Sequence, residues 1–473
     1  MGLLLPVLLA LLACLFGGLY FLGVFRQRRP GEPPLDKGWI PWLGHVLEFR
    51  KDTLKFLQRM RQKHGDVFTI QLGGHYITFL QDPFSFGAFV KESREKLNFT
   101  DFAIQLVKRV FGYHAISSDH SILEATSQKH LKGYGLQIMT ESMMKNLQNL
   151  MLHNLGSAAN RKTWTEDGLF NYCYNIVFRA GYLALYGNAT SETEGDKEKA
   201  INKDRAESDV LFKEFRKYDQ LFPNLAYNVL PPSGRREASR LMDFFWNKLS
   251  LEKIRRQHWT FIFWLLLYIM KDPVALKALR KEVDKVLKES GQEVRPGGPP
   301  VDLTYEMLMK TPVLDSAVEE TLRLVAAPLL TRSVLQDMTL NMADGRQFFI
   351  RKGDRMAVFP YIAVHIDPEI HPDPHTFKYD RFLTPEGTRK TDFYKGGKRV
   401  KYYTMPWGSG VSMCPGRFFA TNELKQFIFL MLVYFDFELI NPDEEIPQID
   451  RRRWGFGTMQ PDREVKFRYR LRY

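Results

Sequence analysis

The sequence predicts a mainly α-helical protein with small β-sheets, an α+β fold that follows one apolar N-terminal helix. Residues 84–187 and 304–324 carry apolar side chains largely at helical spacing. Short runs rich in β-branched and aromatic residues, such as 67–72 and 76–80, predict small sheets. A hydrophobic content of 44% and an aromatic content of 14% indicate a large apolar interior rather than disorder.

The first 25 residues predict a transmembrane anchor. The run from Leu3 to Phe25 carries no charge and is long enough to cross a bilayer, which needs about 20 helical residues. A cleaved signal peptide would have a shorter apolar core and a small-residue cleavage site. Three arginines follow at once, so the positive-inside rule places the rest of the chain in the cytosol. Residues 26–45, basic and rich in proline, predict a stiff hinge, and residues 46–473 contain no glycine–serine linker, so we expect them to form one domain.

A short helix and a hairpin come next. Asp52 is a suitable N-cap for a helix that runs to Lys63, and Gly65 is a suitable stop. The strands at 67–72 and 76–80 are separated by two glycines, which predicts a turn between them. The pair therefore predicts a small hairpin sheet close to the N-terminal anchor.

The middle of the chain predicts helices with one polar interruption. Residues 136–155 predict a long helix whose methionines are typical of core filling. Residues 189–208 are charged and polar with no apolar face, which predicts a solvated loop. Helices are also predicted at 212–222 and 237–249, and the apolar loop between them either dips into a membrane or lies buried.

The C-terminal half predicts buried helices followed by short strands. Residues 259–270 are apolar on every side, which predicts a core helix too short to cross a bilayer. Thr311 and Pro312 are suited to begin a helix that runs to Leu324. In the tail, 454–472, apolar and polar residues alternate enough to predict a closing hairpin. Further short strands are predicted at 339–341, 347–350 and 355–359.

The charge and the cysteines restrict the partners and the compartment. The formal net charge is +13, from 67 basic and 54 acidic residues, which favours anionic membrane surfaces and acidic partners. The basic residues are scattered and no basic helix carries interleaved aromatic residues, so we expect no binding to nucleic acid. Cys14, Cys173 and Cys414 are far apart, which predicts no disulfide framework and suits a reducing compartment.

A glycine-rich loop around Cys414 precedes the last long apolar segment. The sequence from 407 to 417 is W-G-S-G-V-S-M-C-P-G-R. Pro415 is suited to the first helical position, so we expect Cys414 at the N-terminal mouth of a helix, facing unpaired N–H groups and next to Arg417. These surroundings favour a thiolate, which is a strong metal ligand. A buried free cysteine at a helix start is the alternative.

This loop resembles the haem-binding loop of cytochrome P450 monooxygenases. The resemblance implies the P450 fold, a haem cofactor, and Cys414 as the axial thiolate ligand of the haem iron. In two places the loop departs from the family, with tryptophan in place of phenylalanine at 407 and Ser412 in place of a basic residue that contacts a haem propionate. The positions that match the haem-binding part of the loop are Trp407, Gly410, Gly416 and Arg417.

The resemblance also implies a buried ion-pair network. Glu320 and Arg323 are three residues apart and therefore neighbours on one helix face, and alone such a pair is usually an exposed ion pair of little energetic weight. In the family, this pair joins the arginine of a later motif behind the haem. Arg381, in the stretch F-K-Y-D-R-F-L that begins at Phe377, matches that third position.

Three further residues match functional positions of the family. Arg332 matches an arginine that pairs with a haem propionate, and a solvated arginine is the alternative. Phe456 and Thr458 lie in a stretch that matches a turn touching substrate in the family.

The resemblance extends over nearly the whole chain and is greatest to the sterol 12-alpha-hydroxylases of bile-acid synthesis. It rests on stretches such as K-H-G-D-V-F-T-I-Q-L-G-G from Lys63 and R-W-G-F-G-T-M-Q-P from Arg453. It implies a single-pass enzyme of the endoplasmic reticulum membrane with a cytosolic catalytic domain, residues 46–473. Such an enzyme hydroxylates a sterol with dioxygen and electrons from an NADPH-dependent flavoprotein reductase. Two alternatives remain: an endoperoxide isomerase like prostacyclin synthase, which shares several stretches and needs no electrons, and a haem-binding chain without catalysis.

One helix of the family is incomplete in this chain. The family carries a long helix over the open face of the haem, with small residues and a polar side chain beside the oxygen, and only its second half, 261–272, is recognisable here. The residues before it include no glycine or alanine and would place basic side chains in an apolar pocket. We therefore expect a truncation near 249–260, with weakened haem retention. By their distance from Pro273, Gln257 or Thr260 would take the place of the polar residue beside the oxygen.

Overall fold

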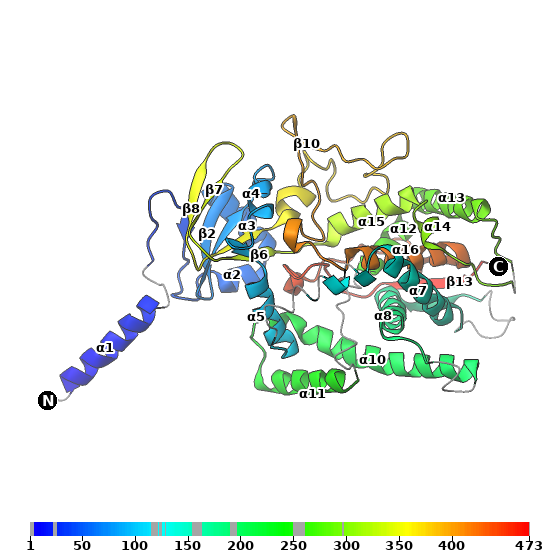
Figure 1. Ribbon diagram of the computed structural model, residues 1–473, viewed down its shortest axis with the longest axis horizontal. Coiled ribbons are helices and arrows are strands. Elements are labelled where there is room, and N and C mark those ends of the chain that lie inside the picture. Colours follow the sequence, from blue (N-terminus) through cyan, green and yellow to red (C-terminus); the bar gives the residue numbers. More distant parts are fainter. Residues whose placement is uncertain are drawn as a thin grey trace.

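A computed structural model of the chain describes residues 4–21, 26–114, 122, 125–127, 129–153, 163–189, 196–248, 261–295 and 298–472. A sheet-containing region lies near the N-terminal helix, and a larger helical region makes up the rest of the body (Figure 1). This is the predicted α+β architecture. The longer helices of the body are α3 (Thr53–His64), α5 (Thr100–Phe111), α7 (Gly133–His153), α8 (Leu169–Tyr186), α10 (Lys197–Ala226), α11 (Pro232–Lys248), α12 (Phe261–Lys271), α13 (Pro273–Glu289), α15 (Pro312–Val325) and α16 (Arg417–Tyr434).

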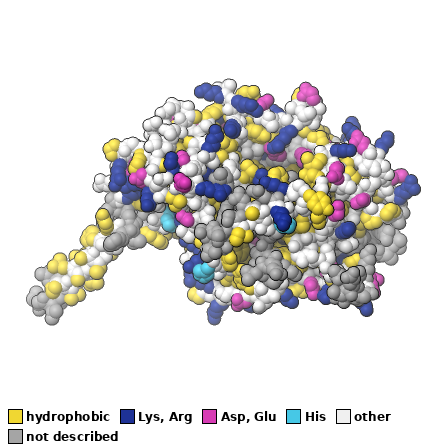
Figure 2. Space-filling view, viewed as in Figure 1, with side chains coloured by type: hydrophobic (Ala, Val, Ile, Leu, Met, Phe, Trp, Pro, Cys, Tyr) yellow, Lys and Arg dark blue, Asp and Glu magenta, His cyan; other side chains and the backbone are white. Residues whose placement is uncertain are grey.

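The N-terminal helix, α1 (Leu4–Phe21), projects away from the body (Figure 1), and apolar side chains cover much of it (Figure 2). Within the described residues, no helix combines the length and the hydropathy needed to cross a bilayer. The expected anchor, residues 1–25, begins and ends outside the described residues.

The main sheet has six strands in the order β1-β2-β3-β9-β6-β4. The predicted hairpin is confirmed: β2 (Val67–Leu72) and β3 (His75–Leu80) pair antiparallel, with φ of 57° at Gly73 and 79° at Gly74. The sheet is larger than a hairpin because strands from a distant part of the chain join it. These are β9 (Arg355–Val358), parallel to β3, and β6 (Leu330–Val334), antiparallel to β9. The outer strands are β1 (Leu35–Asp36) and β4 (Leu97–Asn98).

The short helix α2 (Val46–Lys51) and the longer α3 pack near this sheet (Figure 1). The Asp52 carboxylate accepts from the Lys55 N–H at 3.1 Å, and Gly65 with φ of 85° follows the last helical residue, so both predicted helix ends are confirmed. Leu57 and Met60 are buried against sheet residues in one apolar cluster.

The core of the helical region lies where α8, α12, α15 and α16 meet. As predicted, α12 is buried on every side, because each residue from 262 to 269 is at most 9% exposed. The Trp264 indole N–H donates to the Met459 carbonyl oxygen at 2.8 Å, which ties α12 to the C-terminal segment. The Thr311–Pro312 helix start is confirmed in α15.

The polar segment 189–208 was expected to be a loop, and this prediction is wrong for residues 197–208. They form the first part of α10, with the Asp196 side chain as N-cap. The helix was missed because the stripe it buries is small and polar: Ala200, Asp204 and Ser208 are spaced by four residues. The Ser208 Oγ accepts from the Arg179 Nε at 3.0 Å, so hydrogen bonds replace apolar contacts along this stripe.

The C-terminal tail was expected to form a hairpin on itself, and this is also wrong. Instead, β13 (Lys466–Leu471) is the centre of a three-stranded antiparallel sheet between β12 (Phe435–Leu439) and β5 (Thr165–Gly168). The turn residues 454–460 lie against the end of α15 instead, since the Met459 N–H donates to the Val325 carbonyl oxygen at 2.9 Å. Local alternation cannot reveal partners that lie about 30 and 300 residues away.

The remaining predicted strands are present as β7 (Met338–Asn341) and β8 (Gln347–Ile350), which pair antiparallel, and as β9. Shorter elements complete the described fold: α4 (Phe86–Val90), α14 (Tyr305–Leu308), β10 (Tyr394–Lys395), β11 (Lys398–Arg399), and the single turns η3 (Tyr361–His365), η4 (Gly410–Ser412) and η5 (Arg451–Arg453).

Candidate functional site

The loop from Trp407 to Gly416 carries Cys414 and leads directly into α16. The Cys414 N–H donates to the Trp407 carbonyl oxygen at 2.9 Å, which closes the loop. The Arg417 Nη1 donates to the Cys414 carbonyl oxygen at 2.9 Å and so holds the end of the loop that adjoins α16. The Cys414 side chain is half-buried and is not part of a disulfide. The loop thus presents one thiol on a backbone that is fixed at both ends.

Glycine at 410 is required by the packing of this loop. Gly410 has φ of 64°, and a Cβ there would lie only 2.6 Å from the Val90 carbonyl oxygen at the end of α4. At Gly416, a Cβ would lie 4.0 Å from the Cys414 Sγ, which is ordinary contact. The loop is therefore pressed against α4 at one glycine, and the second keeps the space beside the sulfur open.

The start of α16 differs from the prediction. Pro415 was expected at the first helical position, but the helix begins at Arg417 with Gly416 as N-cap, and no side chain caps it. Pro415 lies in the turn before the helix, so Cys414 is three residues ahead of the first helical residue. Burial lowers the pKa of Arg417, and the neighbouring Cys414 acts in the opposite direction.

A buried arginine lies next to the same contact. The Arg332 Nη1, from β6, donates to the Phe89 carbonyl oxygen at 2.6 Å, and its guanidinium carbon lies 4.5 Å from the centre of the Phe89 ring. Burial and the nearby Arg94 lower the pKa of Arg332 to about 10, so its side chain is still charged at neutral pH. Phe89 immediately precedes Val90, which contacts Gly410, so Arg332 and the cysteine loop meet at the end of α4.

The surroundings of Arg332 and Cys414 suit the haem that the resemblance implies. Arg332 is only 2% exposed, and within the described residues it forms no ion pair with a carboxylate. A buried cation without an anion is costly, so the site favours a negatively charged ligand. A haem propionate is such an anion, and the half-buried Cys414 thiol in its glycine-rich loop suits an iron ligand. The residues of this side therefore fit the group.

Glu320, Arg323 and Arg381 are brought together in the core. The Glu320 carboxylate accepts from the Arg323 Nε at 2.7 Å and from the Arg381 Nε at 2.9 Å. The Glu320 and Arg323 side chains are fully buried, and that of Arg381 is 5% exposed. One carboxylate thus neutralises part of the charge of two arginines that water cannot reach.

Other N–H groups of the two guanidinium groups donate to backbone carbonyl oxygens. Arg323 donates to the carbonyl oxygens of His365 and Pro374, at 2.5 and 2.7 Å. Arg381 donates to that of Pro372 at 2.6 Å, and further to those of Asp373 and Thr376. The network therefore fixes the path of the chain from 365 to 376 against α15.

His365 links this network to the cysteine loop, and no motif in the sequence marks it out. Its Nε2 accepts from the Met405 N–H at 3.0 Å, so the proton is on Nδ1. Burial and the charge of Arg323 lower the pKa of His365 to about 3, and the ring is therefore neutral at physiological pH. Met405 in turn accepts from the Gly408 N–H at 3.2 Å. A continuous chain of contacts thus runs from Glu320 to the loop that holds Cys414.

The other predicted residues lie elsewhere or outside the described residues. The Phe456 ring contacts the Phe222 ring of α10, with centroids 5.4 Å apart. Thr458 forms an isolated β-bridge with Ala326 at the end of α15. Gln257 and Thr260, expected beside the oxygen, lie outside the described residues.

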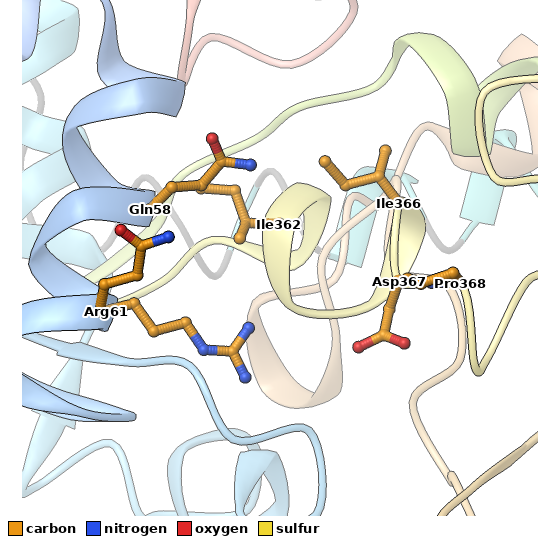
Figure 3. Close-up of a pocket in the computed structure, with 7 residues that line it drawn as sticks. Gln58, Arg61, Ile362, Ile366, Asp367 and Pro368 are labelled. Atoms are coloured by element: carbon orange, nitrogen blue, oxygen red, sulfur yellow. The ribbon is translucent and has the colours of Figure 1, made fainter.

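A surface depression of about 400 Å³ between α3 and η3 contains none of these residues (Figure 3). It is lined by Gln58, Arg61, Gln62, Ile362, Ile366, Asp367 and Pro368. Its open, polar character differs from that expected for the pocket of an apolar ligand.

The buried network makes a prediction about stability. Glu320→Ala would leave two buried guanidinium groups without their carboxylate, and removing one partner of a buried ion pair typically costs about 3–5 kcal/mol. We therefore expect a large fall in the midpoint of thermal unfolding, measured on the full chain by circular dichroism. The control is Glu289→Ala, because Glu289 pairs at 3.8 Å with Lys285, the two side chains are 44% and 73% exposed, and such exposed pairs contribute about 0–1 kcal/mol. Equal midpoints for the two variants would contradict the prediction.

Comparison with known proteins gives two findings that bear on the expected truncation near 249–260. A sequence model of the cytochrome P450 family matches residues 33–261 and, as a second match, residues 258–467. The two matches overlap at residues 258–261. The chain is also 46% identical to the 5-beta-cholestane-3-alpha,7-alpha-diol 12-alpha-hydroxylase of Sus scrofa over 505 residues, which covers 99% of the chain and 98% of that protein. Because the chain has 473 residues, at least 32 of those 505 aligned positions have no counterpart in it.

Two further relatives have similar coverage. The chain is 47% identical to the 7-alpha-hydroxycholest-4-en-3-one 12-alpha-hydroxylase of Homo sapiens, over 98% of each protein. It is 42% identical to the prostacyclin synthase of Homo sapiens, over 94% of the chain and 95% of that protein. With the family match over most of its length, and with the cysteine loop and ion-pair network described above, the chain belongs to the cytochrome P450 family.

Proposed function

We propose that this chain is, by descent, a membrane-bound monooxygenase that hydroxylates the 12-alpha position of a bile-acid precursor. The observation that carries the proposal is the similarity over almost the full length to two 12-alpha-hydroxylases, together with the cysteine loop of a haem-thiolate family. When bound, a haem ligated by Cys414 supplies the activation of dioxygen, and electrons come from an NADPH-dependent flavoprotein reductase.

The residues of the chain bind and orient this group. Cys414 is the proposed ligand of the iron, and the space that Gly416 leaves beside its sulfur lets a flat group approach. Arg332 is the proposed partner of a propionate, because its buried charge has no carboxylate partner in the described part of the chain. The loop is held in shape by the bonds of Trp407 and Arg417 to the Cys414 backbone and by the close packing of Gly410 on Val90.

The substrate wall is proposed at the C-terminal turn, which lies against the end of α15. Phe456 contacts the rings of Phe222 and Tyr227, with centroids 5.4 and 5.2 Å apart. Phe222 and Phe456 also pack against a buried apolar cluster shared by α5, α10 and α11. Such a surface suits a sterol, whose recognition rests on apolar area with few polar contacts. Thr458 is proposed to lie at the edge of the same wall.

We further propose that residues have been lost from the helix on the oxygen side, near 249–260. The interrupted family match and the excess of aligned positions support this. The loss would bring Gln257 or Thr260 to the place of the polar residue beside the oxygen and would leave a gap over the haem. The expected consequences are faster haem loss and low turnover.

The membrane assignment is supported by exposed apolar side chains near the N-terminus. Trp39 is 99% exposed, and Trp42 and Leu47 are 41% and 59% exposed. The Arg50 Nη2 donates to the Asn224 Oδ1 at 2.9 Å, so this segment adjoins the end of α10, where Val229 is 45% exposed. Tryptophan is favoured at the interface of a bilayer. We propose residues 1–25 as a single-pass anchor in the endoplasmic reticulum and 46–473 as a cytosolic catalytic domain. Residues 26–45 are proposed as a stiff hinge that is joined to the catalytic domain where β1 pairs with β2.

A variant at the cysteine tests the proposed cofactor. We expect Cys414→Ala to lose the red-shifted Soret band of the ferrous carbon-monoxide complex that thiolate ligation produces, because no other side chain of this loop offers a thiolate. Ser412→Ala, two residues away in the same loop, is the matched control and should keep the band. The measurement is the difference spectrum of the full-length protein after reconstitution with haem. A Cys414→Ala protein with the spectrum of its parent would exclude Cys414 as the ligand.

Dependence on a reductase separates the two catalytic candidates. The identity of 42% to prostacyclin synthase keeps an endoperoxide isomerase as the second candidate. We expect 12-alpha-hydroxylated product from 7-alpha-hydroxycholest-4-en-3-one only when a reductase and NADPH are added, because hydroxylation consumes two electrons. Product formed from a prostaglandin endoperoxide without a reductase would instead support the isomerase. A chain that binds haem and forms neither product is catalytically inactive.

A further inference from the structure

A buried ion pair joins α10 to the C-terminal turn. The Arg453 guanidinium, from η5, donates to the Asp219 Oδ1 at 3.1 Å and lies 3.0 Å from its Oδ2. The Gln460 Nε2 donates to the same Oδ2 at 2.9 Å. Asp219 and Arg453 are each 9% exposed, and Gln460 is 8% exposed. Both ends of the segment 453–460 are therefore bound to one carboxylate on α10.

A second contact explains why an arginine is needed. In an α-helix, the Asp219 carbonyl oxygen would accept from the N–H of residue 223, but residue 223 is a proline and has none. The Arg453 Nη2 donates to this carbonyl oxygen at 2.8 Å and takes the place of the missing donor. Because an unpaired buried carbonyl is costly, α10 relies on the C-terminal segment to continue past Pro223.

Arg216, on α10 itself, is a second charged neighbour of Asp219. The Arg216 Nη1 lies 3.4 Å from the Asp219 Oδ2, and its guanidinium carbon lies 4.7 Å from the centre of the Tyr174 ring on α8. Tyr218, between these two residues, donates through its hydroxyl to the Val110 carbonyl oxygen of α5. Three segments that are far apart in the sequence thus meet around one turn of α10.

The part of α10 beyond Pro223 carries the aromatic surface that faces the C-terminal turn. The ring of Tyr227, the C-cap residue, contacts the Phe456 ring, and its hydroxyl donates to the Trp454 carbonyl oxygen at 3.5 Å. Leu225 and Ala226 are buried in the same apolar cluster, against which Phe222 and Phe456 pack. The shape of this surface therefore depends on how α10 and residues 453–460 are held relative to each other.

We propose that Asp219 and Arg453 are positioning residues, which lock the end of α10 to residues 453–460 so that Phe222, Tyr227 and Phe456 hold one shape against a sterol. The choice of a sterol as the ligand in this proposal rests on the proposed function. Neither residue touches the proposed haem ligand, so the lock acts on substrate affinity and not on the iron. Loosening it separates two walls of the substrate site while the cysteine loop and the Glu320 network stay intact.

The test uses Asp219→Asn, which keeps the size of the side chain and removes its charge, in the full-length protein. Hydrogen exchange is expected to rise about tenfold in peptides covering both 219–227 and 453–460, because contacts within one network are coupled. The Kd for 7-alpha-hydroxycholest-4-en-3-one, measured by equilibrium dialysis, is expected to rise about tenfold. The carbon-monoxide spectrum is expected to be unchanged, which separates positioning from loss of the fold.

Two further variants make the result specific. Lys213→Gln on the same helix is the matched control, because the Lys213 side chain is 69% exposed and pairs at 2.7 Å with Asp209, and no change is expected. Arg453→Gln should raise exchange in 219–227, and adding Pro223→Ala should reverse this rise there, because alanine supplies the N–H that the Asp219 carbonyl lacks.

The outcomes are distinguishable from failure of the proposed function. Exchange and Kd equal to those of the parent in Asp219→Asn would overturn the proposal. Raised exchange with an unchanged Kd would overturn its substrate part and leave a purely structural contact. A parent chain that binds no sterol would overturn the proposed substrate, and exchange alone would then decide whether the two segments are coupled.

Discussion

The Glu320 carboxylate, buried between two arginines, is the constraint on which the site depends. A buried carboxylate and guanidinium offset the cost of their desolvation only if their hydrogen bonds are complete. Here Arg323 and Arg381 complete theirs with carbonyl oxygens of residues 365 to 376. The neutral ring of His365 then accepts from the N–H of Met405, just before the cysteine loop. The position of the Cys414 loop therefore depends on a carboxylate, that of Glu320, which lies about 90 residues earlier in the chain.

The same solution recurs on the proposed substrate side. Pro223 removes a backbone donor from the middle of α10, and Arg453 from the C-terminal segment replaces it while pairing with Asp219. In both places an arginine satisfies backbone carbonyls that the local structure leaves unpaired, and a single carboxylate balances its charge. The apolar core supplies most of the burial, whereas these two networks determine how distant segments are aligned around the site.

The sequence predicted those elements whose signature lies within a few neighbouring residues. The Asp52 cap, the paired glycines after β2 and the all-apolar α12 each have a signature within a few residues, and each prediction is confirmed. The first part of α10 was missed because it buries Ala200, Asp204 and Ser208 in place of an apolar stripe. The pairing of β13 with β5, and the roles of His365, Asp219 and Arg453, depend on partners tens or hundreds of residues away. No local period encodes such contacts, and the family resemblance pointed only to the residues of its motifs.

We infer that this chain has a haem-thiolate site and that the helix proposed on its oxygen side has lost residues near 249–260. The most direct measurement compares haem dissociation from this chain with that from a version in which the missing segment of the Sus scrofa relative is restored. Transfer of haem to an apo-acceptor protein reports the rate in both. We expect slower haem loss and restored sterol hydroxylation in the lengthened chain. Equal dissociation rates, with hydroxylation no faster than in the present chain, would contradict it.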